Sequence, residues 1–157
     1  MKHPAVTLAV LLASAVSLGA QSARPQGPAR APSDRGLKVE ITVPATVHST
    51  PVTGRVYFIV ARSGDREPRL QIGRTGTPFF GRDVDNLAPG QAAIIDASDL
   101  GTPVASLKDL PPGDYVVQAF VNLYSQFKRS DGHTVWMHDD QWEGQHWNVS
   151  PGNLYSR

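Results

Sequence analysis

The stretch LPPGDYVVQAFVNLY, residues 110–124, decides the fold class of this chain. Its second part alternates as a β-strand does, because successive side chains of a strand point to opposite faces. Apolar side chains occur on both faces, four on one and three on the other: Val117, Ala119, Val121 and Leu123, against Val116, Phe120 and Tyr124. This pattern predicts a long strand inside a sheet.

The turn that leads into this strand is informative too. Leu110 is followed by two prolines, Gly113, an acid and Tyr115. Proline fixes one backbone dihedral and glycine permits the reversal. In immunoglobulin-like sandwiches a tyrosine at such a corner bonds through its hydroxyl to backbone a few residues upstream. We therefore interpret Gly113 and Tyr115 as structural residues.

Further short strands are predicted along the chain, and no long amphipathic helix follows the N-terminal segment. We expect residues 73–90, rich in glycine and proline, to be a long surface loop, and residues 106–110 to form one helical turn. The pattern indicates an all-β protein with an immunoglobulin-like or fibronectin III-like β-sandwich over residues 37–157. The additional strands are expected at residues 37–43, 53–61, 69–72, 92–97 and 133–138.

The N-terminus has the three parts of a secretory signal peptide: a basic start, an uncharged apolar run over residues 5–20, and small residues after it. A cut after Ser22 fits, and cuts after Ala20 or Ala23 fit as well. The alternative is a membrane anchor, but the run is shorter than the ~20 apolar residues that a span needs. We expect residues 1–22 to be removed on export to the periplasm or the cell exterior.

The exported form is neutral and free of cysteine. Losing residues 1–22 removes Lys2, one of 15 Lys and Arg, and none of the 14 Asp and Glu, so the formal charge becomes zero. A neutral chain lacks the basic face that nucleic acids and anionic membranes attract, and we expect neither partner. Thiol catalysis and disulfides are excluded. Residues 23–36 are expected to be a flexible leader.

Histidine and acidic residues gather near the end of the sequence. The spacing argues against a metal site, because His133 and His138 are five positions apart and point to opposite faces of a strand. We favour hydrogen bonds to loop backbone and expect no metal or other cofactor. The six side chains of metal-ligand type fall within fourteen positions: His133, His138, Asp139, Asp140, Glu143 and His146.

All tryptophans lie within twelve positions, as Trp136, Trp142 and Trp147. Aromatic faces stack on sugar rings and anchor protein partners. Because tryptophan is highly buried on average, we favour packing, either in the core or against a neighbouring domain. Phe79 and Phe80 form a second aromatic pair, expected in an exposed loop, where they cap the sandwich or dock on a partner.

No catalytic motif is present in the sequence. The Gly-x-Ser-x-Gly elbow of α/β-hydrolases is missing, and nothing places a histidine beside Ser63. Ser–His–Asp groups assemble in three dimensions, but short strands without an α/β pattern do not favour one here. We expect no enzyme activity from these residues.

Seven stretches are distinctive in combination: residues 53–57 (TGRVY), 67–73 (EPRLQIG), 77–81 (TPFFG), 110–115 (LPPGDY), 131–136 (DGHTVW), 140–144 (DQWEG) and 147–156 (WNVSPGNLYS). Together they resemble the N-terminal region of secreted bacterial esterases. In that family a β-sandwich-like domain precedes a larger α/β-hydrolase domain, which is not among these 157 residues, so no catalytic residue carries over. The resemblance covers nearly all of the mature chain and implies an accessory domain, a truncated gene or a fragment of a longer open reading frame.

Three hypotheses follow. The first is a non-catalytic exported accessory domain that normally precedes an esterase-like hydrolase and positions or stabilises it. The second is a carbohydrate- or cell-wall-binding module that uses Trp136, Trp142 and Trp147. The third is a small metal-binding exported protein that uses His133, His138 and the neighbouring acids.

Overall fold

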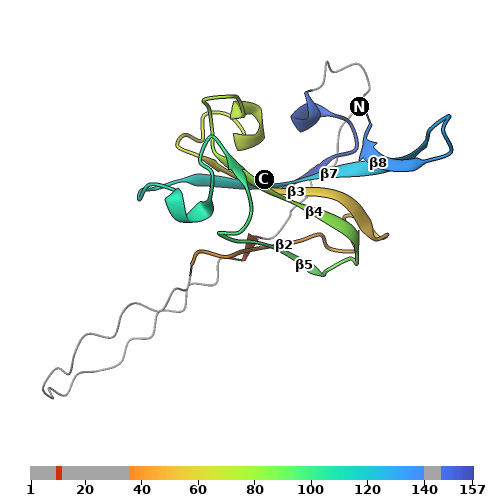
Figure 1. The fold of residues 1–157 in the computed structure, drawn as a ribbon. Helices are drawn as coiled ribbons and strands as arrows, with labels where there is room; N and C mark the ends of the chain where they lie inside the picture. The colour runs from red at the N-terminus through yellow and green to blue at the C-terminus, as the bar shows by residue number, and fades with distance from the viewer. Residues whose placement is uncertain (1–9, 12–35, 140–145) are drawn as a thin grey trace, which may run out of the picture.

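The computed structural model describes residues 10–11, 36–139 and 146–157, which form strands, loops and three short 3-10 helices (Figure 1). The expected all-β class is confirmed. All strand pairs are antiparallel, and they form one large and one small sheet. Within these residues, no helix has the length and apolar character to cross a membrane.

The large sheet has six strands in the order β6-β4-β3-β7-β8, with β9 also paired to β7. At its centre, β3 pairs with β7 from Gly54↔Leu123 to Ala61↔Val116. β7 runs beyond β3, and its last five residues pair with β8 as a two-stranded ribbon. The strands are β3 (Val52–Ala61), β4 (Phe79–Leu87), β6 (Gly101–Thr102), β7 (Val116–Lys128), β8 (Thr134–His138) and β9 (Leu154–Tyr155).

The small sheet has the order β1-β2-β5 and lies below the large sheet in Figure 1. β2 (Val39–Thr42) pairs with β5 (Ala92–Ile95) through four residue pairs, and β1 (Val10–Leu11) pairs with the other edge of β2. The hydrophobic core lies between the two sheets. It joins Val39 and Ile41 of β2 to Val56 and Phe58 of β3 and to their neighbours on β7.

The face of the large sheet that points away from the small sheet is called the outer face below. It carries Arg55, Tyr57 and Ile59 of β3 and the even-numbered residues of β7 from 118 to 124, because the residues between them belong to the core. The helix η1 (Pro68–Gln71) and the C-terminal segment with η3 (Trp147–Val149) pack on this face, above the sheet in Figure 1.

Five predicted strands are present as β2, β3, β5, β7 and β8, and the expected single helical turn is η2 (Leu107–Asp109). The expected corner is also present, because the Tyr115 hydroxyl donates to the Pro111 carbonyl oxygen. Gly113 has φ +149°, and a Cβ there would lie 2.2 Å from a guanidinium nitrogen of Arg62. That guanidinium lies over the Tyr115 ring at 4.1 Å.

Three predictions were wrong. Residues 73–90 are no loop, because they contain the nine-residue strand β4. Phe79 and Phe80 are therefore strand residues, and Phe80 is fully buried in the core, so it is not available for docking. The strand expected at 69–72 is instead η1, because Pro68 at its first position favours a helical turn.

Most of the N-terminal prediction lies outside the described residues. Of the expected signal peptide, only Val10–Leu11 is described, as β1. Of the expected leader, only Gly36 is described, and it is exposed.

Candidate functional site

One end of the outer face is closed by aromatic packing. The Trp147 ring stacks on Tyr57 with centroids 4.4 Å apart and planes at 20°, and meets the Phe120 ring edge-on at 5.5 Å. Phe79 completes the cluster, 5.8 Å from Trp147 and 5.9 Å from Tyr57. Burial raises the pKa of Tyr57 to about 12. Trp147 is thus partly buried, and one face of its indole is occupied by Tyr57.

Buried polar side chains hold the C-terminal segment onto this end. Gln118 on β7 accepts a hydrogen bond from the Arg69 backbone N–H (2.9 Å) and donates one to the Ser156 carbonyl oxygen (2.7 Å). The Ser156 hydroxyl accepts from the Ala119 N–H (3.0 Å). Arg69 donates to the Asn148 carbonyl oxygen (3.0 Å), and the Asn148 amide donates back (2.7 Å). These contacts fix the position of Trp147.

The other end of the outer face holds an open cleft of about 610 Å³. Ligand pockets of proteins usually measure about 300–1,000 Å³. The cleft lies between the start of β3, the end of β4, the middle of β7, the second half of β8 and the C-terminal loop. The lining residues that bear on its chemistry are His48, Thr50, Thr53, Asp85, Asn122, Tyr124, Ser125, Trp136, Asp139 and Asn153.

Asn122 is the unusual member of this lining. Its side chain is only 3% exposed, and its Oδ1 is a buried atom without a hydrogen-bond partner in the part of the chain that the structure describes. Buried polar atoms are nearly always paired, because leaving one unpaired costs free energy. The cleft therefore contains one acceptor that the described protein groups do not satisfy.

Trp136 is exposed at the cleft. It lies on β8 opposite Gln126 of β7, so it shares a face with Tyr124, which pairs with His138. Half of its surface is exposed. Burial raises the pKa of Tyr124 above that of a free tyrosine. The cleft thus presents an indole and a tyrosine ring, and the orphaned amide oxygen of Asn122 is buried behind its wall.

Two carboxylates line the cleft, and both are hydrogen-bonded. Asp85 accepts from the Thr53 hydroxyl (3.0 Å), and Asp139 accepts from the Ser125 hydroxyl (2.8 Å). No Lys or Arg side chain is among the lining residues of the described structure. The cleft is therefore polar, and its fixed charge is negative.

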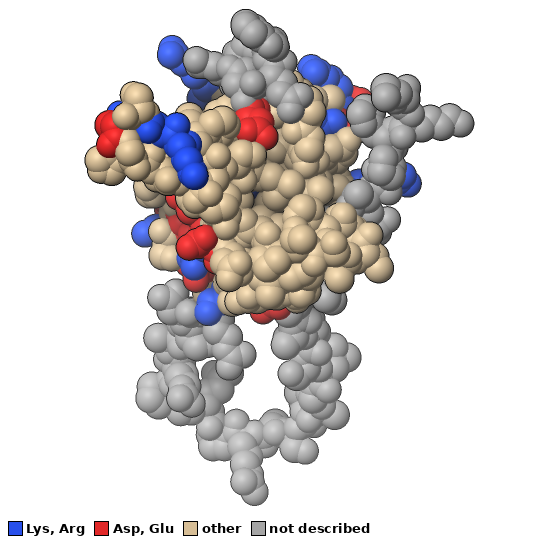
Figure 2. All heavy atoms as spheres, turned by 90° about the vertical axis from the view of Figure 1, so that its right-hand side faces the viewer, with Lys and Arg blue, Asp and Glu red and all other residues tan. Residues whose placement is uncertain are grey.

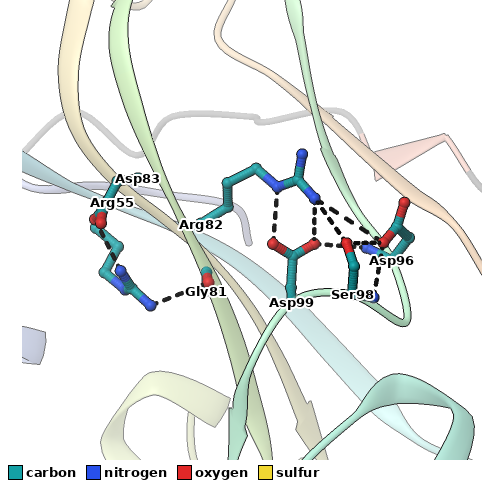
Figure 3. Close-up of polar contacts among 7 residues, drawn as sticks. All are labelled: Arg55, Gly81, Arg82, Asp83, Asp96, Ser98 and Asp99. Carbon is teal, nitrogen blue, oxygen red and sulfur yellow. Dashed lines mark hydrogen bonds and ion pairs between the residues drawn. The ribbon is translucent and has the colours of Figure 1, made fainter.

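Two arginine–carboxylate ion pairs lie outside the cleft and join different segments of the fold (Figure 3). Arg55 donates to Asp83 (2.8 Å) and to the Gly81 carbonyl oxygen (3.0 Å), which joins β3 to β4. Arg82 donates hydrogen bonds to both carboxylate oxygens of Asp99 (2.8 and 2.9 Å), which connects β4 to the loop after β5. In that loop, hydrogen bonds from Ser98 lower the pKa of Asp96. Groups that satisfy one another in this way have little capacity left for a ligand.

The histidines do not form a metal site within the described residues, where no cluster of three ligand-type side chains occurs. His133 is highly exposed and contacts Asp131 (3.2 Å), whereas His138 ends β8. Three of the candidate residues, Asp140, Trp142 and Glu143, lie outside the described residues.

Nor does the cleft show a catalytic arrangement. His48 Nε2 lies 3.0 Å from the Thr50 hydroxyl. An activated nucleophile also needs a third group that orients its base, and no carboxylate bonds to His48 in the described part of the chain. Ser125 bonds to a carboxylate and not to a base.

Of the candidate site residues named from the sequence, Trp136 and Asp139 line the cleft in the described structure. Phe79 and Trp147 meet in the aromatic cluster instead. Sequence reasoning missed Asn122 and Asp85 as site residues, because only the pairing of distant strands brings them together. No known family model, curated protein or solved structure matches this chain.

Proposed function

We propose that this chain is a non-catalytic exported accessory domain that positions or stabilises an esterase-like hydrolase domain. Its export rests on the signal-type N-terminus. The partner rests on the resemblance of seven stretches to the N-terminal region of secreted esterases. The paired sheets and the Tyr115–Pro111 bond support an immunoglobulin-like or fibronectin III-like sandwich as the finer fold.

The observation that carries the proposal is the ribbon of β7 and β8, which extends beyond the body of the domain (Figure 1). Phe127 and Met137 share one face of the ribbon, because Phe127 lies opposite Val135 and Ser125 lies opposite Met137. They are 40% and 48% exposed. Exposed apolar side chains that share a surface are typical of protein contacts. This face is opposite to the one that carries Trp136.

The proposal is tested by joining the domain to an esterase-like hydrolase domain and measuring the thermal unfolding and the ester hydrolysis of the hydrolase. We expect the joined domain to raise the hydrolase melting temperature by several degrees. The double variant Phe127→Ser/Met137→Ser should abolish that gain. Leu100→Ser is the matched control, because Leu100 is 78% exposed and lies away from the ribbon. The proposal would be contradicted if the joined domain changed neither the melting temperature nor the ester hydrolysis of the hydrolase.

A second assay tests the lack of catalysis. The purified chain alone should hydrolyse p-nitrophenyl butyrate no faster than buffer does. Robust hydrolysis that one serine substitution removes would refute the proposal.

Carbohydrate binding is the second candidate function. Its original form needed three tryptophans, and Trp147 is occupied in packing. The cleft beside Trp136 favours carbohydrate binding by this one tryptophan.

A further inference from the structure

We propose that the outer-face cleft binds a neutral carbohydrate, with Trp136 as the stacking surface and Asn122 as a buried hydrogen-bond partner. This inference goes beyond the accessory function. It stands on the cleft geometry and not on the resemblance to esterases.

The first support is the exposure of Trp136. Tryptophan is among the most buried residue types on average, yet Trp136 is half exposed at the cleft. Trp147, the other described tryptophan, is stacked on Tyr57. The apolar face of a pyranose ring packs on an indole, and this contact needs an accessible ring beside hydrogen-bonding groups.

The second support is the orphaned acceptor. Asn122 Oδ1 is buried at the cleft without a partner in the described structure. A side-chain amide offers an acceptor and two donors, and a sugar hydroxyl is both donor and acceptor. Oδ1 itself is closed to solvent in the ligand-free chain, so a sugar hydroxyl reaches it when the ligand displaces the groups that cover it. A ligand rich in hydroxyl groups then supplies the missing partner.

The third support is charge. Without Lys or Arg in the lining, the cleft offers no counter-charge to a phosphate or carboxylate ligand. Figure 2 shows the side toward which the ribbon projects, where Lys and Arg lie at the margins of a broad uncharged area. Asp85 and Asp139 each already accept a hydroxyl, and no three ligand-type side chains meet in the described residues, so a metal cation is not favoured.

The test is a calorimetric titration of the purified chain with cellohexaose, xylohexaose, maltohexaose and chitohexaose. Each is taken to about 10 mM, which reveals a Kd of about 1 mM. Oligogalacturonate serves as the anionic comparison. Trp136→Ala removes the stacking surface. Met137→Ala is the matched control, because Met137 is the next residue, is equally exposed and points to the other face. Asn122→Leu replaces the amide by a side chain of similar shape.

We expect saturable binding of at least one neutral oligosaccharide and none of oligogalacturonate. Trp136→Ala and Asn122→Leu should each weaken that binding about tenfold or more, as expected when an aromatic anchor or a buried hydrogen bond is lost. Met137→Ala should bind as the parent does. Asn122→Leu should not lower the melting temperature of the ligand-free chain, which separates a lost contact from lost folding.

Three results would overturn the inference: no heat with any neutral oligosaccharide, binding that both variants retain, or preferential binding of oligogalacturonate. None of these results bears on whether a hydrolase domain is stabilised, so the two proposals fail separately.

Discussion

Replacing Trp147 by alanine tests the reading that this residue closes the outer face. The indole stacks on Tyr57 at 4.4 Å and contacts the Phe120 and Phe79 rings at 5.5 and 5.8 Å. Removing a buried aromatic side chain costs about 3–5 kcal/mol. Because Trp147 is only partly buried, we expect a loss of about 3 kcal/mol in the free energy of unfolding, at the lower end of that range.

Urea and thermal denaturation measure this loss. In a domain of this size, about 3 kcal/mol lowers the melting temperature by about 10 °C. A double-mutant cycle with Tyr57→Ala should return a coupling of about 1 kcal/mol, the usual value for a stacked pair. The matched control is Trp136→Ala, which should cost less than about 1 kcal/mol, since exposed substitutions cost little.

The reasoning would be refuted if Trp147→Ala unfolded no more easily than Trp136→Ala. It would also be refuted if Trp147→Ala left stability intact and abolished binding of a sugar, because Trp147 would then be a platform.

Three further predictions concern the strands beneath this face. A Cβ on Gly54 would lie 2.1 Å from the Asn122 carbonyl oxygen. Gly54→Ala should therefore push β3 away from β7 and lower the free energy of unfolding by about 3 kcal/mol or more. Gly73 has open space around it, so Gly73→Ala should leave the free energy of unfolding unchanged in the same denaturation experiment. Burial raises the pKa of Tyr57 from 10.0 to about 12, so folding favours the neutral phenol. That stabilisation is complete below pH 10 and lost as the pH rises from 10 toward 12; it amounts to about 2 kcal/mol after allowance for partial exposure. Stability curves of the parent should fall across this window relative to Tyr57→Phe, and parallel curves would contradict the assignment. Asn122→Leu removes an unpaired buried oxygen and should raise the free energy of unfolding of the ligand-free chain by about 1 kcal/mol; a clear loss would show that the amide has a structural partner.

The fold was predictable from the sequence where apolar residues alternate or dominate. β2, β3 and β7 have such patterns, and the LPPGDY turn predicts the Tyr115 bond. β4 could not be recognised, because its centre reads Gly81-Arg82-Asp83. Those charges belong in a strand only because Arg55 and Asp99 supply partners from other segments. Sequence periodicity does not contain such long-range pairs.

The site was less predictable than the fold. The concentration of tryptophan pointed to the correct region, but no local pattern separates Trp147, which packs on Tyr57, from Trp136, which is exposed. The difference arises because Gln118 and Ser156 anchor the C-terminal segment over one end of the sheet. Asn122 is one of several polar residues in β7, and only its burial without a partner in the described structure distinguishes it.

The most direct test of this account is to follow the tryptophan indole N–H signals by NMR while the neutral oligosaccharides are added. The outer face has a closed aromatic end at Trp147 and an open cleft at Trp136. We therefore expect the Trp136 signal to shift in a saturable way while the Trp147 signal stays in place. A shift confined to Trp147, or no shift of Trp136 with any of these sugars, would contradict this expectation.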